Sequence, residues 1–384
     1  MKNFFPPLTT LETLPTPCYL YDTALLEETL QAAQREAAQY HYEIHYAVKA
    51  NFNHRILQQI AACGLGADCV SGGEMQAVLQ AGFPAEKIVY AGVGKADEEI
   101  ALALEKNIFC FNVESLAELK VIDELAGKRK KVAPVALRIN PDIIVNTHRH
   151  IITGVKENKF GINLDLLDAV LKTLPELKNV AFKGLHFHIG SQITDMENFH
   201  SLCLRVNEIQ ERLSGMGLLP EHLNLGGGLG INYYAPEEER IAGFSAFFQL
   251  FATHLKRYGG QHIHFELGRS LVGQCGTLLT KVLYVKEGSV KKFAIADAGM
   301  TELIRPALYE AYHKIENISS GGAVEKYDVV GPVCESTDSF GKDVPLNKVS
   351  RNDLLLICSA GAYGESMSSH YNCRQLREPY FYGK

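Results

Sequence analysis

The sequence predicts a (β/α)8 barrel of the TIM type followed by a β-rich domain, and three observations lead to this α/β fold class. Eight short apolar runs of strand length lie between Ile44 and Gly268. Amphipathic segments with helical spacing separate most of these runs, and the alternation stops after Gly268. Strands that alternate with helices form a parallel sheet, and eight such units close into a barrel. We therefore expect the barrel over residues 25–268 and the β-rich domain over residues 269–384, joined by residues 1–24.

The expected strands are near-continuous apolar runs, which is typical of parallel strands that are buried on both faces. They span Ile44–Lys49, Gly66–Val70, Lys87–Gly92, Ile108–Val113, Ala133–Asn140, Gly184–Gly190, His222–Gly227 and His262–Gly268. The expected helices include Leu25–Tyr40, Gly73–Ala81, Asp97–Glu105, Leu116–Leu125 and Met196–Gly215. An open doubly wound sheet is the alternative fold. It would place a glycine-rich nucleotide loop after the first strand, where Lys49 stands instead.

The last third of the chain has strand patterns joined by turns, with only brief helical patches. The expected strands are Thr277–Val285, Lys292–Ala296, Tyr327–Val330 and Leu354–Ser359. The segment Pro15–Asp22 is also β-like, and for this reason we expect the start of the chain to join the β-rich domain.

Composition limits the possible partners. The chain has 384 residues and a net charge of −6, so neither a basic patch for nucleic acid nor a polybasic membrane tether is expected. Residues 1–10 do not form a signal peptide, and no apolar stretch is long enough to span a bilayer. The nine cysteines have neither CxxC nor metal-like spacing, which favours reduced thiols and a cytoplasmic protein.

The chemistry is expected at the carboxyl ends of the barrel strands, and the first of these ends carries Lys49. A lysine after an apolar strand can simply extend its ammonium to the rim. Alternatively, desolvation lowers its pKa, and the free amine forms a Schiff base with an aldehyde. The other strand ends favour the second interpretation. They carry Asp68, His186, His188, Ser191, Gly226, Gly227, Gly228, Glu266 and Arg269.

The triple glycine suits a loop whose backbone amides face an anion, although a flexible turn is the simpler alternative. His186 and His188 alternate along one strand and also suit a metal-dependent hydrolase barrel. A cation there would repel Lys49 and Arg269, so a bound anion is favoured and no metal is expected. His186 is expected to be a satisfied core residue.

Five motifs in chain order carry a resemblance that covers nearly the whole sequence. They are Tyr46-Ala47-Val48-Lys49, Gly66-Ala67-Asp68 through Glu74, His186-Phe187-His188-Ile189-Gly190-Ser191, Leu225-Gly226-Gly227-Gly228 and Glu266-Leu267-Gly268-Arg269. Together they resemble the fold-type III pyridoxal-phosphate decarboxylases. The family usually has proline where Leu267 stands.

The resemblance implies a role for each of these residues. Lys49 would hold pyridoxal phosphate as a Schiff base, and His188 would stack on the pyridine ring. Glu266 would pair with the ring nitrogen and make the cofactor a strong electron sink. The phosphate would be bound by Gly226–Gly228, Ser191, Arg269 and Tyr363, and Asp68 would complete the cofactor site. Lys49, Cys334, His188 and Glu266 would be the catalytic residues.

Within this family, Arg305-Pro306-Ala307-Leu308-Tyr309, Cys334-Glu335-Ser336 and Ala362-Tyr363-Gly364 most resemble the enzymes that decarboxylate meso-diaminopimelate to L-lysine and CO2, the last step of lysine synthesis. Arg305 and Tyr309 match contacts to the distal carboxylate, and Glu335 matches the contact to the distal ammonium. Arg269 and Tyr363 would also face the substrate. The alternative is a decarboxylase of another basic amino acid or of a carboxylated polyamine.

Cys334 resembles a cysteine that the family supplies across a dimer interface to protonate the carbanion. The resemblance therefore implies a homodimer with shared active sites. The stretch Thr147–Gly154 through Lys159–Ile162 resembles a loop over the active site. Two other classes share the barrel and the lysine: non-catalytic proteins that bind pyridoxal phosphate, and racemases with an arginine near the ring nitrogen. Glu266 disfavours both, and the second domain also disfavours the first.

Overall fold

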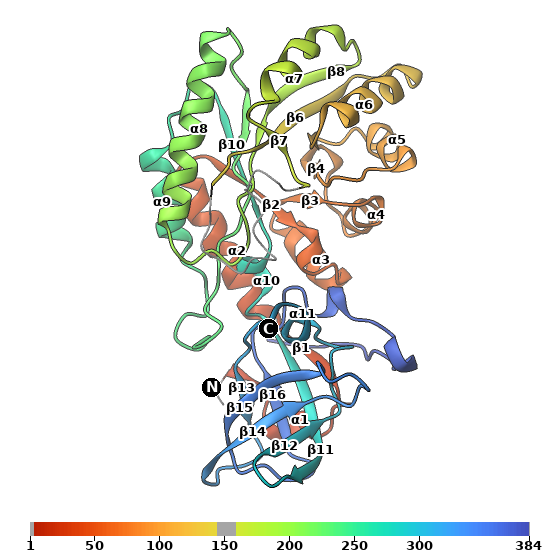
Figure 1. The fold of residues 1–384 in the computed structure, drawn as a ribbon, viewed down its shortest axis with the longest axis vertical. Coiled ribbons are helices and arrows are strands. Elements are labelled where there is room, and N and C mark those ends of the chain that lie inside the picture. The colour runs from red at the N-terminus through yellow and green to blue at the C-terminus, as the bar shows by residue number, and fades with distance from the viewer. Residues whose placement is uncertain (1–3, 144–158, 384) are drawn as a thin grey trace. The chain divides into compact units, whose positions relative to one another are not determined.

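The computed structural model describes residues 4–143 and 159–383 (Figure 1). The chain divides into two compact units. The barrel unit consists of Leu30–Gly230 and Gly243–Gly268, and the second unit consists of the residues up to Thr29, Ile231–Ala242 and the residues from Arg269 onward. The part of the expected active-site loop over Thr147–Gly154 lies outside the described residues.

Eight parallel strands form a closed barrel, which confirms the predicted fold. In their order around the barrel they are β2 (Tyr42–Ala47), β3 (Gly66–Cys69), β4 (Ile88–Tyr90), β5 (Cys110–Val113), β6 (Ala133–Asn140), β8 (Val180–His186), β9 (His222–Asn224) and β10 (His262–Leu267). The pairing of β10 with β2 closes the ring. A ninth short strand, β7 (Ile162–Asn163), pairs with β6 beside the ring.

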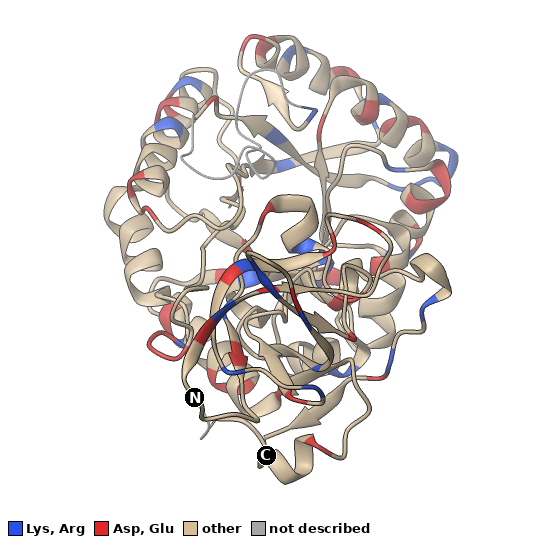
Figure 2. Cartoon of the chain, turned by 60° about the horizontal axis from the view of Figure 1, so that its bottom comes forward, with Lys and Arg blue, Asp and Glu red and all other residues tan. Residues whose placement is uncertain are grey.

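Helices follow most of the barrel strands and surround the sheet (Figure 1). They are α2 (Thr23–Ala38), α3 (His54–Ala62), α4 (Gly72–Gln80), α5 (Asp97–Lys106), α6 (Leu116–Lys128), α7 (Leu167–Thr173), α8 (Glu197–Gly215) and α9 (Phe244–His254). Serine side chains begin two of them close behind their strands, because Ser71 accepts the amide of Glu74 and Ser115 accepts that of Glu118. Figure 2 shows acidic and basic residues interspersed along these helices.

Several strands are shorter at their carboxyl ends than the sequence predicted, and the excess residues form the site. Lys49 lies in the 3-10 turn Val48–Ala50 after β2, not at the tip of the strand. Similarly, His188 follows the end of β8, and the triple glycine follows the end of β9. These loops are buried, so their sequences remain largely apolar after the strands end. For this reason the predicted strands extend past the observed strand ends.

An aromatic cluster fixes the strand that carries Glu266. Phe265 packs edge-on against Phe251 with ring centroids 4.9 Å apart, and Phe247 packs in the same way against Phe199, also at 4.9 Å. These contacts join α8 and α9 to β10, and each such pair contributes about 0.5–1.5 kcal/mol beyond area burial. Because neighbouring residues of a strand point to opposite faces, anchoring Phe265 outward directs Glu266 into the barrel.

The second unit is built on a mostly antiparallel sheet in the order β13-β16-β11-β12-β14-β15, and β1 pairs with both β11 and β17. Its strands are β1 (Cys18–Asp22), β11 (Gly276–Glu287), β12 (Lys292–Ala296), β13 (Ile315–Asn317), β14 (Val324–Val330), β15 (Ser339–Asn347), β16 (Leu354–Ile357) and β17 (Tyr380–Tyr382). The β-like segment at the start of the chain therefore pairs with this sheet, antiparallel to β11.

The stretch Ile231–Ala242 lies within the range expected for the barrel but groups with the second unit. Polar contacts explain this grouping. Arg240 pairs with Asp22 at 3.1 Å, and Lys314 forms an ion pair with Glu237. Such long-range ion pairs leave no periodic pattern in the sequence.

Candidate active site

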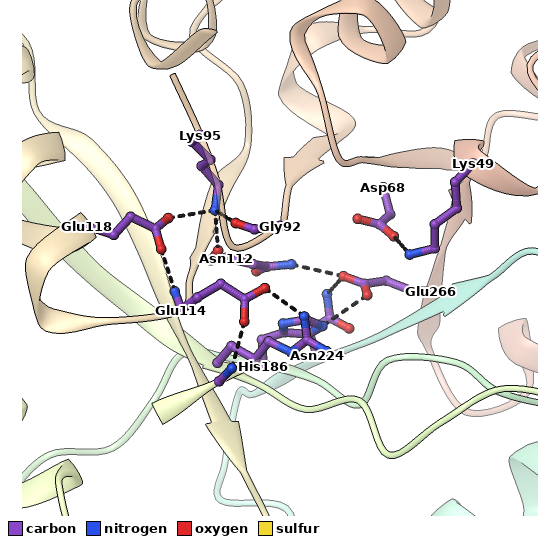
Figure 3. Close-up of polar contacts among 12 residues, drawn as sticks. Lys49, Asp68, Gly92, Lys95, Asn112, Glu114, Glu118, His186, Asn224 and Glu266 are labelled. Atoms are coloured by element: carbon purple, nitrogen blue, oxygen red, sulfur yellow. Dashed lines mark hydrogen bonds and ion pairs between the residues drawn. The ribbon is translucent and has the colours of Figure 1, made fainter. Parts of the chain in front are cut away.

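The first site residue of the barrel is Lys49, whose amine lies 3.6 Å from Asp68 Oδ2 (Figure 3). The Lys49 side chain is 41% exposed, whereas Asp68 is almost fully buried at the end of β3. The parallel pairing of β2 with β3 brings the two residues together, because the two strands end side by side. The amine is therefore accessible and lies beside an anion.

Asp68 has an unusual environment for a buried carboxylate. Neither of its oxygens has a hydrogen-bond partner within the part of the chain that the structure describes. Burial, together with the nearby charge of Glu266, raises the pKa of Asp68 to about 6, although Lys49 acts in the opposite direction. Buried polar groups are nearly always hydrogen-bonded, so these oxygens indicate a site that binds something further.

Glu266 is the second buried carboxylate, and a set of donors holds it in place (Figure 3). Its Oε1 accepts the side-chain amides of Asn112 at 2.9 Å and of Asn224 at 2.7 Å. Its Oε2 accepts from His186 Nε2 at 2.9 Å. A carboxylate has about four lone-pair sites. Three are therefore used, and one on Oε2 remains for a ligand.

The charge of Glu266 is strongly stabilised. Burial would raise the pKa of Glu266, but His186, followed by Lys49, holds it well below that of an ordinary glutamate. The carboxylate therefore remains ionised at any physiological pH. A buried anion of this kind attracts a positively charged donor such as a protonated ring nitrogen.

The triple glycine after β9 is required by close backbone packing. A Cβ on Gly227 would lie 1.8 Å from the Glu266 carbonyl oxygen, and one on Gly226 would lie 2.2 Å from that of Phe187. Two of the three amides donate within the protein, from Gly226 to Asn224 Oδ1 and from Gly227 to His188 Nδ1. The Gly228 amide has no hydrogen-bond partner among the described residues, so this amide can donate to a ligand.

His188 and Ser191 lie beside the glycine loop. Ile193 bridges to Leu229, so the loop after β8 runs alongside the glycines. The Gly227 amide points at His188 Nδ1 from 3.4 Å, which requires that this nitrogen carry no proton. Burial, followed by the charges of Arg138 and Lys49, keeps the pKa of His188 well below its usual value. A neutral imidazole is suited to stacking on an aromatic ring.

A chain of buried ion pairs lies beside Asn112, one of the donors to Glu266 (Figure 3). Lys95 donates to the Asn112 carbonyl at 2.9 Å and to Glu118 at 2.6 Å. Glu118 in turn accepts the Glu114 amide, and Glu114 pairs with Arg138 at 2.6 Å. This network holds the backbone at Asn112, the residue whose side-chain amide donates to Glu266.

The second unit brings together another group of predicted residues. Arg269, in the short helix α10 (Arg269–Val272), donates to the Tyr233 hydroxyl at 2.6 Å, and its guanidinium carbon lies 4.9 Å from the centre of the Tyr363 ring. Arg305 begins the helix α11 (Arg305–Tyr309) and donates to the same hydroxyl at 2.9 Å. Both arginines are buried. Arg305 has no carboxylate within ion-pair distance among the described residues.

The remaining predicted residues lie elsewhere in the second unit. Cys334 and Glu335 are exposed, and Glu335 accepts the Tyr371 hydroxyl at 2.6 Å. Within the described chain, neither forms a hydrogen bond or an ion pair with Arg305. Tyr309 is half-buried at the end of α11.

Sequence reasoning assigned no role to four residues that the structure places in these groups: Asn112, Asn224, Tyr233 and His313. The sequence could have identified the two asparagines as site residues, because each is a polar residue at the end of an apolar strand. His186 was expected to be a satisfied core residue, and it donates to Glu266. Tyr233 and His313 lie in segments without periodic pattern, and only tertiary contacts identify them.

Across residues 4–143 and 159–383, no group of three or more His, Cys, Asp or Glu side chains is arranged to hold a metal ion. In the same residues, no helix is both long and apolar enough to cross a membrane.

Comparison with known proteins identifies the family. The family model for "Pyridoxal-dependent decarboxylase, pyridoxal binding domain" matches residues 23–273. A diaminopimelate decarboxylase of Bacteroides thetaiotaomicron is 58% identical over 381 residues, which cover 99% of this chain and 98% of that protein. The enzyme of the same name from Haemophilus influenzae is 43% identical over 365 residues, covering 94% and 87%.

Solved structures agree with this assignment. Diaminopimelate decarboxylase of Helicobacter pylori, complexed with L-lysine, matches with a TM-score of 0.90 and 39% identity over 96% of this chain and 92% of that chain. A lysine/ornithine decarboxylase of Vibrio vulnificus is 21% identical with a TM-score of 0.84 over 98% of this chain and 96% of that chain, a likeness in fold alone. The chain therefore belongs to the diaminopimelate decarboxylase family, within the fold-type III pyridoxal-phosphate-dependent decarboxylases.

Proposed function

We propose that this protein decarboxylates meso-diaminopimelate to L-lysine and CO2, with pyridoxal phosphate bound at Lys49. Family membership supports the reaction and the cofactor. The observation that carries the choice of substrate is Arg305, a buried cation that has no carboxylate partner among the described residues. Diaminopimelate has a second carboxylate at its far end, whereas ornithine and arginine end in cations that Arg305 would repel.

The residues present fit pyridoxal phosphate. The cofactor needs an amine for its aldehyde, cations and amides for its phosphate, and an acid for its ring nitrogen. Lys49 offers an accessible amine, and the Gly228 amide and the buried Arg269 suit an anion. Glu266 retains an acceptor site for a protonated ring nitrogen, and the Asp68 oxygens lack other hydrogen-bond partners within the described chain.

The proposed binding roles follow from these properties. Lys49 holds the cofactor through a Schiff-base linkage, and Asp68 holds the lysine side chain toward it. Neutral His188 stacks on the pyridine ring. The phosphate is bound by Gly226–Gly228, Ser191, Arg269 and Tyr363.

When bound, pyridoxal phosphate supplies an electron sink that accepts the electron pair left behind as CO2 departs. The protein keeps that sink effective through Glu266, whose low pKa holds a proton on the ring nitrogen. Arg305 and Tyr309 bind the distal carboxylate and orient the substrate, and Arg269 and Tyr363 complete this end of the pocket. Cys334 donates the proton that replaces CO2 on the reacting carbon.

We also infer that the active form is a homodimer with shared sites. The support is that Cys334 and Glu335 are exposed and make no contact with Arg305, so a partner subunit can receive both residues. In the partner's site, Glu335 binds the distal ammonium. Mixing Lys49→Ala with Cys334→Ala subunits should restore part of the activity through hybrid dimers. No recovery at all would contradict sharing.

The expected domain and compartment remain parts of this proposal. The barrel over residues 25–268, without the stretch Ile231–Ala242, is the pyridoxal-phosphate-binding domain, and residues 269–384 with 1–24 are the β-rich domain. All nine cysteines are free, which supports a reducing compartment such as the cytoplasm. Thiol titration of unreduced protein should count nine thiols, and a disulfide would contradict the compartment.

The experiment that tests the function is CO2 release by cofactor-loaded protein with meso-diaminopimelate, L-ornithine, L-arginine and a carboxylated polyamine. Turnover confined to diaminopimelate, with lysine as the product, is expected. Turnover of another substrate would overturn the substrate choice and keep the chemistry. Borohydride reduction and peptide mapping should place the cofactor on Lys49, and Lys49→Ala should abolish both labelling and turnover.

A further inference from the structure

Among the described residues, the groups that hold Arg305 in place are neutral. Its Nη1 donates to the Tyr233 hydroxyl at 2.9 Å and to His313 Nε2 at 2.8 Å. Side chains that orient an arginine are commonly carboxylates, which also cancel its charge. Tyr233 and His313 orient the guanidinium and leave its charge available to a ligand.

The tautomer of His313 follows from its second contact. His313 Nδ1 donates to the Cys358 carbonyl at 2.8 Å, so Nε2 carries the lone pair that accepts from Arg305. A protonated ring would set an N–H against the guanidinium. Burial, followed by Arg305, accordingly lowers the pKa of His313 to about 3. The imidazole is therefore neutral under all working conditions.

The backbone fixes His313 firmly. It lies between α11 and β13, and Cys358 directly follows β16. These two strands pair, and the Cys358 amide donates to the Lys314 carbonyl at 2.9 Å. His313 is 2% exposed, and its ring packs edge-on against Tyr233 with centroids 5.1 Å apart. The acceptor nitrogen is thus aimed at one place by the sheet itself.

Tyr233 joins Arg305 to the second buried arginine. Its hydroxyl oxygen accepts from Arg269 at 2.6 Å and from Arg305 at 2.9 Å, so both lone pairs are used. Although burial opposes it, the two guanidiniums lower the pKa of Tyr233 below its usual value. Two like charges held around one phenol are costly in a buried site, and anionic ligands can offset that cost.

We propose that His313, with Tyr233, is a specificity-determining positioning residue that orients Arg305 without neutralising it, so that the cation selects ligands with a distal carboxylate. The inference rests on the proposed function and names what enforces its substrate choice. It does not require His313 to touch the substrate. If His313 were purely structural, its replacement would change the binding of ligands with and without a distal carboxylate alike.

The test compares His313→Glu with His313→Gln in the cofactor-loaded dimer. Both replacements reach Arg305 with an oxygen, but only Glu brings a negative charge. The probes are the product L-lysine, which keeps the distal carboxylate, and cadaverine, the same chain without that group. Inhibition constants for both probes, with KM and kcat for diaminopimelate, separate recognition of the carboxylate from general damage.

His313→Glu should raise the inhibition constant of lysine and the KM for diaminopimelate by about ten- to a hundredfold, the value of hydrogen bonds to a charged group. Cadaverine inhibition and kcat should change by less than about threefold, because neither depends on the carboxylate. His313→Gln should resemble the wild type for both probes. Equal losses for lysine and cadaverine, or no difference between Glu and Gln, would overturn the proposal.

If His313→Glu fails to bind the cofactor, the His313→Leu variant tests the proposal in its place. It removes the acceptor and adds no charge, so lysine should weaken by about three- to tenfold relative to cadaverine. Unchanged discrimination in His313→Leu would overturn the proposal. A wild-type protein that does not turn over diaminopimelate would instead contradict the proposed function, so the two failures can be told apart.

Discussion

In the barrel unit the buried charges of the site are the carboxylates of Asp68 and Glu266, whereas in the second unit they are the guanidiniums of Arg269 and Arg305. Asparagine amides and an imidazole surround Glu266, while a phenol and an imidazole surround Arg305. Each unit therefore orients a buried charge through hydrogen bonds with its own side chains. The comparison teaches that the two units use the same arrangement for buried charges of opposite sign.

The largest expected effect comes from removing the barrel's anion. Glu266→Gln keeps the size of the side chain but cannot hold a proton on the ring nitrogen. We expect kcat to fall by about 10²–10³-fold, as when a preorganised electrostatic group is lost. Steady-state kinetics would measure it. Glu197→Gln, on an exposed glutamate of α8, should leave kcat unchanged. A Glu266→Gln enzyme with the kcat of the wild type would contradict the role given to the charge of Glu266.

The next effect concerns Asp68, whose buried charge lowers the stability of the cofactor-free fold. The folded pKa of Asp68 is about 6, above its ordinary value of 3.8, so ionised Asp68 destabilises the cofactor-free fold at neutral pH. Asp68→Asn should stabilise that fold by up to about 3 kcal/mol above pH 6. The gain should shrink as the pH falls toward 4, because Asp68 then takes up its proton in the folded state.

Urea unfolding of cofactor-free protein, followed by circular dichroism at several pH values, measures this gain. Asp165→Asn, at an exposed position, is the matched control and should change little. A destabilised Asp68→Asn protein at pH 7.5 would mean that the carboxylate is satisfied within the fold and is not held in reserve.

A chain of histidines in the barrel unit makes the stability of that unit depend on pH. His45 Nδ1 donates to the Lys87 carbonyl at 3.2 Å, and its Nε2 lies 3.1 Å from His264 Nδ1. His264 Nε2 lies 2.9 Å from His222 Nδ1. Burial lowers the pKa of all three rings, and in His264 the neighbouring His45 adds to this effect. In the second unit, His313 is a buried histidine of the same kind.

Below the ordinary histidine pKa of 6.5, the unfolded chain binds protons that these folded rings refuse, so stability falls as the pH decreases. His264→Gln can still donate and accept but no longer titrates. It should reduce the loss of stability by up to about 1.4 kcal/mol per pH unit below 6.5. Amide hydrogen exchange of barrel peptides at pH 7.5 and 5.5 would detect it. If His264→Gln loses as much stability as the wild type between pH 7.5 and 5.5, His264 is not a cause of that loss.

The smallest effect tests whether charge or hydrogen bonding matters more at Glu266. Asn112→Leu removes one of its three hydrogen bonds, and the loss of a hydrogen bond to a charged group costs about 1.5–3 kcal/mol. The loss of this hydrogen bond should raise the pKa of Glu266. That pKa lies so far below its ordinary value that the carboxylate should remain ionised at pH 7.5. We therefore expect kcat to change by less than about threefold at pH 7.5. A loss as large as that of Glu266→Gln would show that Asn112 matters for more than charge.

The barrel could be predicted because its information is local. Apolar runs of strand length and amphipathic segments with helical spacing mark most steps of the alternation. The ends of the strands were predicted less well, since the buried loop residues around Lys49 and His188 look like continued strand. The glycine loop was predicted for its amides, but its tightest constraint is backbone packing against the Glu266 carbonyl.

The partners within the site could not be predicted, because they depend on distance in space. Asn112 meets Glu266 across 154 residues of sequence, and Tyr233 reaches Arg305 across 72. No periodic pattern records such pairings. His313 is a comparable case, since only the pairing of β13 with β16 aims its ring at Arg305.

The most direct test of the central claim uses the unmodified enzyme. Competitive inhibition constants for L-lysine and cadaverine should be measured side by side with the cofactor-loaded protein at pH 7.5. If Arg305 is held in reserve for a distal carboxylate, lysine should bind about ten- to a hundredfold more tightly than cadaverine. Equal binding of the two, or tighter binding of cadaverine, would contradict the account.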